Sequence, residues 1–438
     1  MLLKIKLLLY WILVAIAVQD NWQDIAKCDV LLVSHDNDHS YTYRNQAYSH
    51  LLDSLGELIR KKGLITQSVA QPFSRLTKSK AYGEPVAWNR KRLFIILQFL
   101  LVIRLFRESN YSRQWREKQI QNFWQKVIEL SRPKIIIAIQ PEPSLCRAAH
   151  AQRIPIYDLQ HGVICDQHPW YGEEFRKHEP PENLPSGFLC WDKTSAATLE
   201  KWTKQKGITV HIIGNPWFQR FFTVDADDLL VQEALTTQPL LGNQRPTILV
   251  SLQWGMIEYA GQYVPNGVMP DALEKTILNT AKSYNWLLRL HPVQIRGSES
   301  PRVQNYLAKT FGHLDTVEWQ QCSEVPLPVV LKWSNLHLTY NSTTTIEAAW
   351  MGVYTGLLDP EIRPGGQNST YYSYERSLGI AETLPLDSLA IETWIKSTLT
   401  KGQAKSTLVD SRANLEAFIS KIALQCSTDD SLLYLDRR

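Results

Sequence analysis

Short apolar runs alternate with stretches of helical periodicity along most of this chain, and this alternation constrains the possible folds more than any other feature. The runs are continuously apolar and rich in β-branched residues, which is typical of strands buried on both faces of a parallel sheet. We expect strands at residues 28–34, 134–139, 154–159, 187–191, 210–213, 246–252, 286–291, 316–319 and 335–340. We expect helices at residues 43–62, 115–130, 144–151, 195–206, 271–284, 303–311, 389–399 and 411–424. This order predicts an α/β protein with doubly wound, Rossmann-like sheets.

The length of the chain indicates two domains, because 438 residues are too many for one core of ordinary size. A looser stretch at 216–245 separates the two groups of expected strands. We therefore divide the chain into an apolar, membrane-associating segment at 1–27, a Rossmann-like domain at 28–218, a second one at 246–385, and C-terminal helices at 386–438. Apolar residues make up 44% and charged residues 21%, which indicates a globular protein.

The net charge of +4 conceals an asymmetry between the two parts of the chain. Residues 1–150 contain 22 basic and 12 acidic residues, a balance of +10, and the remaining residues contain 25 and 31, a balance of −6. A basic N-terminal part suggests an anionic partner, such as membrane phospholipid, a lipid pyrophosphate or an anionic glycan. Nucleic acid is not expected, because no nucleic-acid motif is present and the basic residues alternate with long apolar runs.

Two apolar segments bear on membrane contact. Residues 7–18 follow Lys4 and Lys6, and residues 93–106 follow the basic run 90–92. Twelve helical residues span about 18 Å, short of the roughly 30 Å hydrocarbon core of a bilayer. Both segments therefore fit a protein that lies on an anionic membrane face. Two alternatives remain open: a signal peptide ending near 15–17, and a simple buried helix at 93–106.

Six cysteines occur without any Cys-x-x-Cys pair, and most lie in apolar surroundings. This pattern favours buried, reduced thiols in a cytoplasmic protein over disulfides or a zinc site.

Polar residues follow two of the expected strands in the second domain. Arg289 and His291-Pro292 end one strand, and Ser342, Thr343 and Thr344 follow another and open an expected helix that contains Glu347. The carboxyl edge of a parallel sheet is where ligands bind, and hydroxyls beside a helix start suit a phosphate. The spacing of Thr344 and Glu347 also fits an ordinary capping box. We expect this set to bind the phosphates and ribose of a nucleotide.

The first domain has its own polar residues at strand ends. Gln160, His161 and Gly162 follow one strand and Asn215 follows another, and we place them in a ligand-binding cleft. Asp36 and Asp38 follow the first strand, and Glu142 follows a third. A carboxylate or an imidazole can take a proton from an attacking hydroxyl. Asp36, Asp38, Glu142 and His161 are therefore the catalytic candidates.

Four motifs in this order resemble a known group: Gln160-His161-Gly162, Gly214-Asn215-Pro216, His291-Pro292, and Asn341-Ser342-Thr343-Thr344 with Glu347-Ala348. The sequence resembles bacterial capsule and surface-polysaccharide glycosyltransferases, a group that includes the retaining Kdo transferases. It is similar to bacterial sialyltransferases in the His-Pro and Ser-Ser/Thr motifs, and to teichoic-acid glycerophosphotransferases in its C-terminal half. The resemblance implies a GT-B fold, with two domains facing a cleft and the donor nucleotide held by the C-terminal domain.

The resemblance further implies a nucleotide-sugar donor, which we expect to be CMP-linked, and a surface-polysaccharide or lipid-linked glycan acceptor. The chain departs from the sialyltransferase pattern, because no acidic pair precedes a glycine after the first strand, so the base and the stereochemistry stay open. Asp36-Asn37-Asp38 has the letters of a metal-binding triplet but lies in the wrong domain. We therefore expect a metal-independent enzyme without a cofactor. We expect it on the inner face of the cell membrane.

Two other functions remain open from the sequence. The same phosphate-binding residues suit a CDP-polyol phosphotransferase of the teichoic-acid type. A non-catalytic nucleotide-binding scaffold of a polysaccharide assembly complex is the other possibility.

Overall fold

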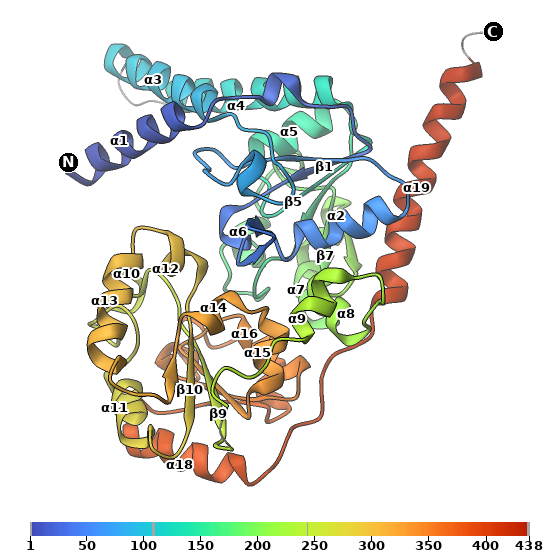
Figure 1. The fold of residues 1–438 in the computed structure, drawn as a ribbon. Coiled ribbons are helices and arrows are strands. Elements are labelled where there is room, and N and C mark those ends of the chain that lie inside the picture. The colour runs from blue at the N-terminus through green and yellow to red at the C-terminus, as the bar shows by residue number, and fades with distance from the viewer. Residues whose placement is uncertain (1, 107–109, 243, 436–438) are drawn as a thin grey trace. The chain divides into compact units, whose positions relative to one another are not determined.

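The computed structural model describes residues 2–106, 110–242 and 244–435, and the chain forms two compact units. The first unit contains the described residues up to Ile164, His168–Gln219 and those from Asp410 onward. The second unit contains Cys165–Gln167 and Arg220–Val409. Each unit is built on a parallel sheet with helices packed around it (Figure 1). The prediction of two doubly wound α/β domains is confirmed.

The sheet of the first unit has six parallel strands in the order β4-β1-β5-β6-β7-β8. In chain order they are β1 (Val30–Val33), β4 (Thr66–Val69), β5 (Ile135–Ala138), β6 (Ile156–Leu159), β7 (Gly187–Cys190) and β8 (Thr209–Ile212). The helices are α1 (Leu2–Ala17), α2 (Leu52–Lys61), α3 (Asn89–Phe106), α4 (Asn110–Ser131), α5 (Pro143–Ala151), α6 (Glu173–Arg176), α7 (Lys193–Thr203) and α19 (Arg412–Leu435). Helix α8 (Pro216–Phe222) crosses the boundary to the second unit.

The sheet of the second unit also has six parallel strands, in the order β11-β10-β9-β12-β13-β14. They are β9 (Thr247–Ser251), β10 (Asn285–Arg289), β11 (Val317–Glu318), β12 (Leu336–Thr339), β13 (Tyr354–Leu357) and β14 (Ala381–Thr383). The helices are α9 (Leu229–Leu235), α10 (Met256–Ala260), α11 (Asp271–Thr280), α12 (Pro292–Arg296), α13 (Ser300–Phe311), α14 (Gln321–Glu324), α15 (Leu327–Trp333), α16 (Thr344–Trp350), α17 (Ser373–Ser377) and α18 (Ser388–Leu399).

The direction of winding reverses once in each sheet. In the first unit, β4 lies on one side of β1 and β5 lies on the other. In the second unit, β10 lies on one side of β9 and β12 lies on the other. Loops leave in opposite directions at such a switch point, which opens a crevice outside the carboxyl ends of the two strands. The crevices are therefore expected beyond β1 and β5, and beyond β9 and β12.

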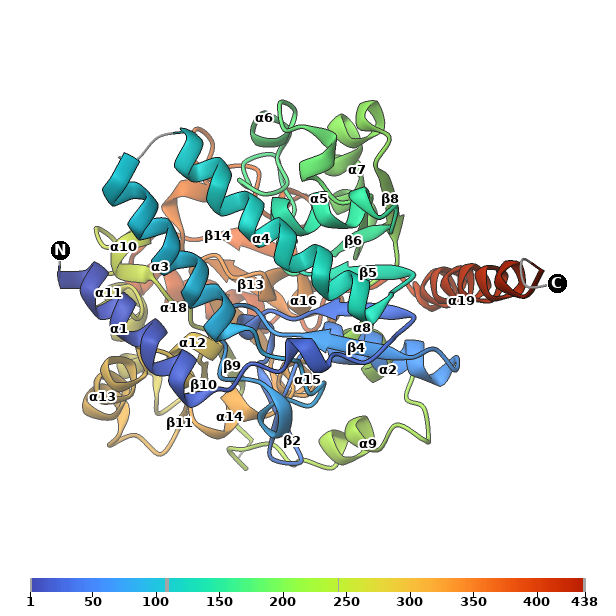
Figure 2. The same cartoon turned by 90° about the horizontal axis from the view of Figure 1, so that it is seen from above.

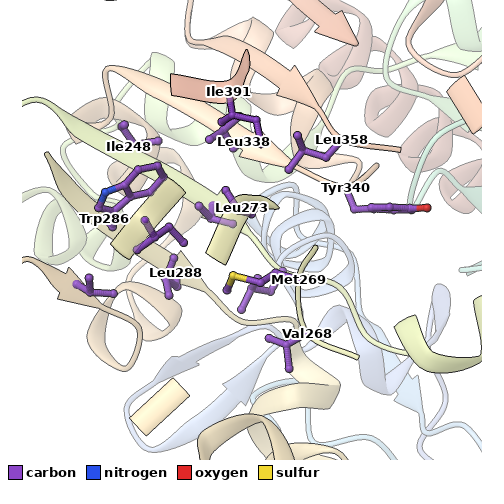
Figure 3. Packing of buried hydrophobic residues seen from close by; sticks show 14 of the residues in the cluster. Ile248, Val268, Met269, Leu273, Trp286, Leu288, Leu338, Tyr340, Leu358 and Ile391 are labelled. Carbon is purple, nitrogen blue, oxygen red and sulfur yellow. The ribbon is translucent and has the colours of Figure 1, made fainter. Parts of the chain in front are cut away.

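A continuous apolar core holds the second unit together. Figure 3 shows its strand residues Trp286, Leu288 and Leu338 packed with Leu273 of α11 and Ile391 of α18. All five side chains are almost completely shielded from solvent. Because the central strands β9, β10 and β12 are buried along nearly their whole length, they show continuous, largely apolar runs in the sequence.

One expected helix begins later than its periodicity suggested. Residues 43–62 were expected to be helical, but a two-stranded hairpin of β2 (Tyr41–Tyr43) and β3 (Gln46–Tyr48) comes first, and α2 begins only at Leu52. Arg44 and Asn45 both have positive φ, as the tight turn of such a hairpin requires. Helical spacing alone cannot distinguish these hairpin residues from a first helical turn.

The segment expected to form C-terminal helices, 386–438, divides between the two units. Helix α18 packs on α11 in the second unit, and α19 returns to the first unit. There the ring of Phe418 packs against Tyr157 of β6 and His211 of β8, with centroids 5.4 and 5.5 Å apart. The helix therefore completes the first unit from the far end of the sequence.

Two further expectations concern cysteines and membranes. All six cysteines lie within the described ranges, where they are buried and form no disulfide, as their apolar surroundings suggested. Among the helices of the described residues, none combines the length and the apolar character needed to cross a membrane.

Truncating Leu288 in the core should destabilise the second unit strongly. We expect Leu288→Ala to lower the free energy of unfolding by about 2–5 kcal/mol, because it removes buried methyl groups and leaves a cavity. Urea unfolding followed by tryptophan fluorescence measures the change. Leu278→Ala, at an exposed position of α11, is the control and should cost less than about 0.5 kcal/mol. Equal losses in the two variants would contradict the position of Leu288 in the core.

Candidate functional site

Three loops at the carboxyl edge of the second sheet are joined through one residue, Gln253. It follows β9, and its amide pairs twice with Asn341 after β12: the Asn341 N–H donates to Gln253 Oε1 (2.8 Å), and Gln253 Nε2 donates to Asn341 Oδ1 (2.6 Å). Its main-chain carbonyl accepts from Gln294 Nε2 of α12 (2.7 Å). The loops after β9, β10 and β12 are thus brought together at the switch point.

His291 caps helix α12 in the loop after β10. Its Nδ1 accepts from the Val293 N–H (3.2 Å), and Gln294 Oε1 accepts from the His291 N–H (3.0 Å). Because Nδ1 accepts, a neutral imidazole carries its proton on Nε2 and presents a donor there. The indole of Trp254, which is half exposed, lies 6.1 Å from the imidazole between ring centroids.

Ser342, Thr343 and Thr344 form the turn between β12 and α16. Ser342 Oγ accepts from the Thr344 N–H (3.3 Å) and lies 3.2 Å from Thr344 Oγ1. Ser342 and Thr343 are partly exposed, whereas Thr344 is buried. The expected capping box is wrong in its register: Thr344 is the first helical residue, and the N-cap is Thr343. Glu347 is buried one turn into α16.

Arg289, at the end of β10, is partly buried and is already engaged by main-chain carbonyls. Its Nη1 donates to the carbonyl oxygens of Val325 (2.7 Å) and Cys322. Burial lowers the pKa of the guanidinium, and the negative charge of Glu347 partly offsets this effect. Arg289 therefore fastens β10 to the α14–α15 connection, and its expected contact with phosphate stays a prediction.

A polar network around the buried side chains of Asn341 and Asp359 extends this edge to the loop after β13. Asp359 Oδ2 accepts from Asn341 Nδ2 (2.6 Å) and from Asn368 Nδ2 (2.8 Å). The hydroxyl of Tyr259 accepts from the same two amides, at 2.7 and 2.9 Å. Sequence analysis missed Gln253, Tyr259 and Asp359. The first and last follow strands as closely as His291 does, so the same reasoning could have found them.

In the first unit, the two aspartates after β1 differ in environment. Asp38 has no exposed surface; it pairs with His50 Nδ1 (3.0 Å) and accepts from Ser49 Oγ and the Leu51 N–H (3.3 Å). Burial favours the neutral carboxyl, but the ion pair with His50 and these hydrogen bonds hold the pKa of Asp38 well below its usual range. Asp36 is partly exposed, and its Oδ1 accepts from Ser74 Oγ (2.6 Å).

An enclosed, strongly ionised carboxylate is a poor base and cannot reach a ligand. Asp38 instead fixes the start of α2 and the ring of His50. Asp36 is the carboxylate of this pair that an acceptor can approach.

His161 lies at the end of β6, beside the end of β1. Its ring is 5.4 Å from that of His35, between centroids. Burial lowers the pKa of His161 to about 4, although the charge of Asp38 opposes the effect. The imidazole is therefore neutral near pH 7. Asp36 and His161 thus belong to the same carboxyl edge of the first sheet.

The remaining candidates of the first unit make contacts that hold the fold. Gln160 is buried; it accepts from the Trp191 N–H (2.7 Å) and donates to the carbonyl of Gly162 (2.9 Å). Glu142 Oε1 accepts from Trp124 Nε1 (2.6 Å) at the start of α5. Asn215 Oδ1 accepts from two N–H groups in the first turn of α8. Their expected roles in catalysis or ligand binding stay predictions.

Several solved structures share this fold across nearly the whole chain. A UDP-GlcNAc 2-epimerase from Neisseria meningitidis bound to UDP-GlcNAc has a TM-score of 0.54 at 12% identity, covering 90% of this chain and 98% of that one. The S. aureus MnaA–UDP co-structure has a TM-score of 0.52 at 15% identity, covering 88% of this chain and 93% of that one. The Methanocaldococcus jannaschii UDP-GlcNAc 2-epimerase in complex with UDP-GlcNAc and UDP has a TM-score of 0.53 at 10% identity, covering 89% of this chain and 97% of that one.

At such low identity these likenesses establish the fold, which consists of two parallel-sheet α/β domains of the GT-B type. No protein-family model and no curated protein matches the chain.

The buried imidazole of His161 should make stability depend on pH. Its pKa in the folded chain, about 4, lies below that of an unfolded histidine, about 6.5, so the unfolded state binds more protons between these values and stability falls as the pH falls. His161→Gln should therefore lose less stability than the wild type between about pH 7 and about pH 5. Urea unfolding at both pH values measures this difference. His313→Gln changes an exposed histidine of the second unit and is the control. An equal loss in His161→Gln and the wild type would refute the shift.

Proposed function

We propose that this chain is a GT-B glycosyltransferase that moves a sugar from a nucleotide-activated donor to a surface-polysaccharide or lipid-linked glycan acceptor. The observation that carries the proposal is the convergence of the His291 loop and the Asn341–Thr344 loop at the β9–β12 switch point, joined by Gln253. Switch points are the ligand sites of doubly wound sheets. We further propose that the enzyme is peripheral to the inner face of the cell membrane.

The donor site combines groups that suit a diphosphate or monophosphate ester. The imidazole of His291 offers an N–H, and the hydroxyls of Ser342 and Thr343 are partly exposed at the same edge of the sheet. Trp254 offers a flat apolar face next to the imidazole, which a nucleobase or a sugar can cover. The motif resemblance favours a CMP-linked donor, and the similar structures that contain UDP or UDP-GlcNAc make a uridine nucleotide the competing choice.

The acceptor side of the proposal uses the first unit. Glycosyl transfer requires a base that takes the proton of the attacking hydroxyl. Asp36 is partly exposed, and neutral His161 can accept a proton at the same sheet edge. Asp38 stabilises this edge because it pairs with His50 and accepts from the Leu51 N–H just before α2. We therefore assign the base to Asp36 or His161, and a positioning role to Asp38.

A nucleotide-sugar epimerase is the second candidate, because UDP-GlcNAc 2-epimerases are among the solved structures that share this fold. A transferase forms a new glycoside only when an acceptor is present, whereas an epimerase converts the donor alone. Transfer of a polyol phosphate would instead give a phosphodiester. Product analysis with and without acceptor distinguishes the three: mass spectrometry separates a glycoside from a phosphodiester, and NMR detects the epimer, which has the same mass as the donor.

A nucleotide that binds the second unit should raise the melting temperature. At about 100 times its dissociation constant it stabilises the fold by about 2.7 kcal/mol, which a thermal-shift screen of CMP, CDP, UDP, GDP and ADP detects. His291→Asn should reduce the shift, since asparagine retains the N-cap but removes the imidazole. His313→Gln should not. If only GDP or ADP shifts the melting temperature, or if His291→Asn responds as the wild type does, the donor assignment is wrong.

Removing the acceptor-side base should slow turnover without affecting donor binding. We expect Asp36→Asn to lower kcat by about 10²–10⁴-fold if Asp36 is the base, with an unchanged nucleotide-induced thermal shift. Glu129→Gln, at an exposed position of α4 in the same unit, is the control and should keep the wild-type kcat. Unchanged kcat in Asp36→Asn together with a large loss in His161→Gln would assign the base to the histidine. Loss of nucleotide binding in Asp36→Asn would contradict the division of roles.

A further inference from the structure

Helices α1 and α3 carry a cluster of apolar side chains that are exposed to solvent. The two helices pack against each other and lie side by side in both views of the molecule (Figures 1 and 2). The exposed members are Leu7, Leu9, Tyr10, Leu13 and Ile16 on α1, and Phe94, Leu97, Leu100 and Leu101 on α3. We call these nine residues the α1–α3 surface. So many large apolar side chains on two neighbouring helices mark an interaction site in a folded protein.

The spacing of these residues places most of them on one side of each helix. On α3 the exposed positions 94, 97, 100 and 101 recur at intervals of three and four, and on α1 positions 9, 13 and 16 do the same, while Leu7 lies on the side of Val14 at the start of the helix. Residues at such intervals share one side of a helix. The opposite side is used for packing, since Val14 and Ile95 are buried. The exposed side chains are therefore not used for packing within the first unit.

Polar contacts hold the two helices in a defined arrangement. Arg90 Nε, in the first turn of α3, donates to the carbonyl of Ala15 in the last turn of α1 (2.9 Å). The carboxylate of Asp20 accepts from the N–H groups of Arg90 (2.9 Å) and Lys91 (2.8 Å). Each charge complements the dipole of the helix end that it contacts. The helices that carry the α1–α3 surface are therefore held in place by specific hydrogen bonds within the first unit.

The charged side chains of the two helices themselves are all basic. Neither α1 nor α3 contains an acidic residue, whereas Lys6 and Arg90 are exposed and Lys91 is partly exposed. Arg116 of α4 lies over the ring of Phe99 (5.0 Å to the centroid) and adds a further positive charge. A second copy of the same surface would bring like charges together. An anionic lipid surface complements both the apolar face and the basic residues.

We infer that the α1–α3 surface lies in the headgroup region of an anionic bilayer, with its apolar side chains among the acyl chains. This inference deepens the proposed function, because a lipid-linked acceptor is presented at such a bilayer. Neither helix crosses the membrane in this arrangement. Both lie along it, as amphipathic helices with basic flanks do.

The segment 71–76 connects this surface to the acceptor side of the proposed active site. From α1, Trp11 stacks on Phe73 with centroids 5.1 Å apart. From α3, Asn89 Oδ1 accepts from the Phe73 N–H (2.7 Å). The next residue, Ser74, donates to Asp36 Oδ1 (2.6 Å). The partly exposed carboxylate after β1 is therefore linked to both membrane-facing helices, so that docking would hold it at the bilayer surface.

Vesicle sedimentation of the full chain tests the inference without any nucleotide. We use vesicles of equal parts phosphatidylcholine and phosphatidylglycerol, and vesicles of phosphatidylcholine alone. The wild type should sediment with the anionic vesicles, less so at high salt, and only weakly with the neutral ones. The double variant Leu13→Asp/Leu101→Asp should lose about tenfold or more of the binding, because two charges are placed on the apolar face.

Leu389→Asp, at an exposed position of α18 in the second unit, is the matched control and should bind as the wild type does. Melting temperatures verify that every variant is folded. The inference is overturned if the wild type stays in the supernatant or if the double variant binds unchanged. It is also overturned if sedimentation velocity shows a dimer that the double variant dissociates, because the surface would then bind a second copy. Nucleotide binding, measured without vesicles, tests the proposed function separately.

Discussion

Parallel pairing within each sheet is the constraint on which the rest of this structure depends. When all strands of a sheet run in one direction, their carboxyl ends and the loops that follow them lie at one edge. In the second unit this brings together Gln253, His291 and Asn341, which are far apart in the sequence, and the side chain and main-chain carbonyl of Gln253 then join the loops directly. In the first unit it brings the ends of β1 and β6 together, with the rings of His35 and His161 in proximity.

The same edge must also satisfy its own buried polar groups, and this need decides which residues remain available for chemistry. Buried N–H and C=O groups require partners, so side chains after the strands are used as caps and bridges. Asp38 is used at the start of α2, Gln160 between β6 and β7, and Arg289 at the α14–α15 connection. Asp36 and Ser342 keep exposed surface. Roles that look equivalent in the sequence therefore differ in the folded protein.

Much of the fold could be predicted, because strands buried on both faces leave continuous apolar runs and helices leave a period of 3.6 residues. β5, β6, β9, β10 and β12 lie where these runs are. The hairpin β2–β3 could not be distinguished from helix, since Tyr43 and Ala47 have the spacing of a helical face. The Asn341–Asp359–Tyr259 network could not be found either, because it depends on contacts between segments that are distant in the sequence.

The sequence by itself determined the α/β class, most of the strands and helices along the chain, and the positions at which polar residues follow strands. Each of these follows from local periodicity and residue type. Strands β4, β13 and β14 were not predicted, because their short runs are polar or contain glycine. Only the tertiary structure decided which polar residues are enclosed, which helix starts they cap, and that α1 and α3 pack together with apolar side chains still exposed. Burial and partnership depend on segments brought together from different parts of the chain, and no local pattern encodes that.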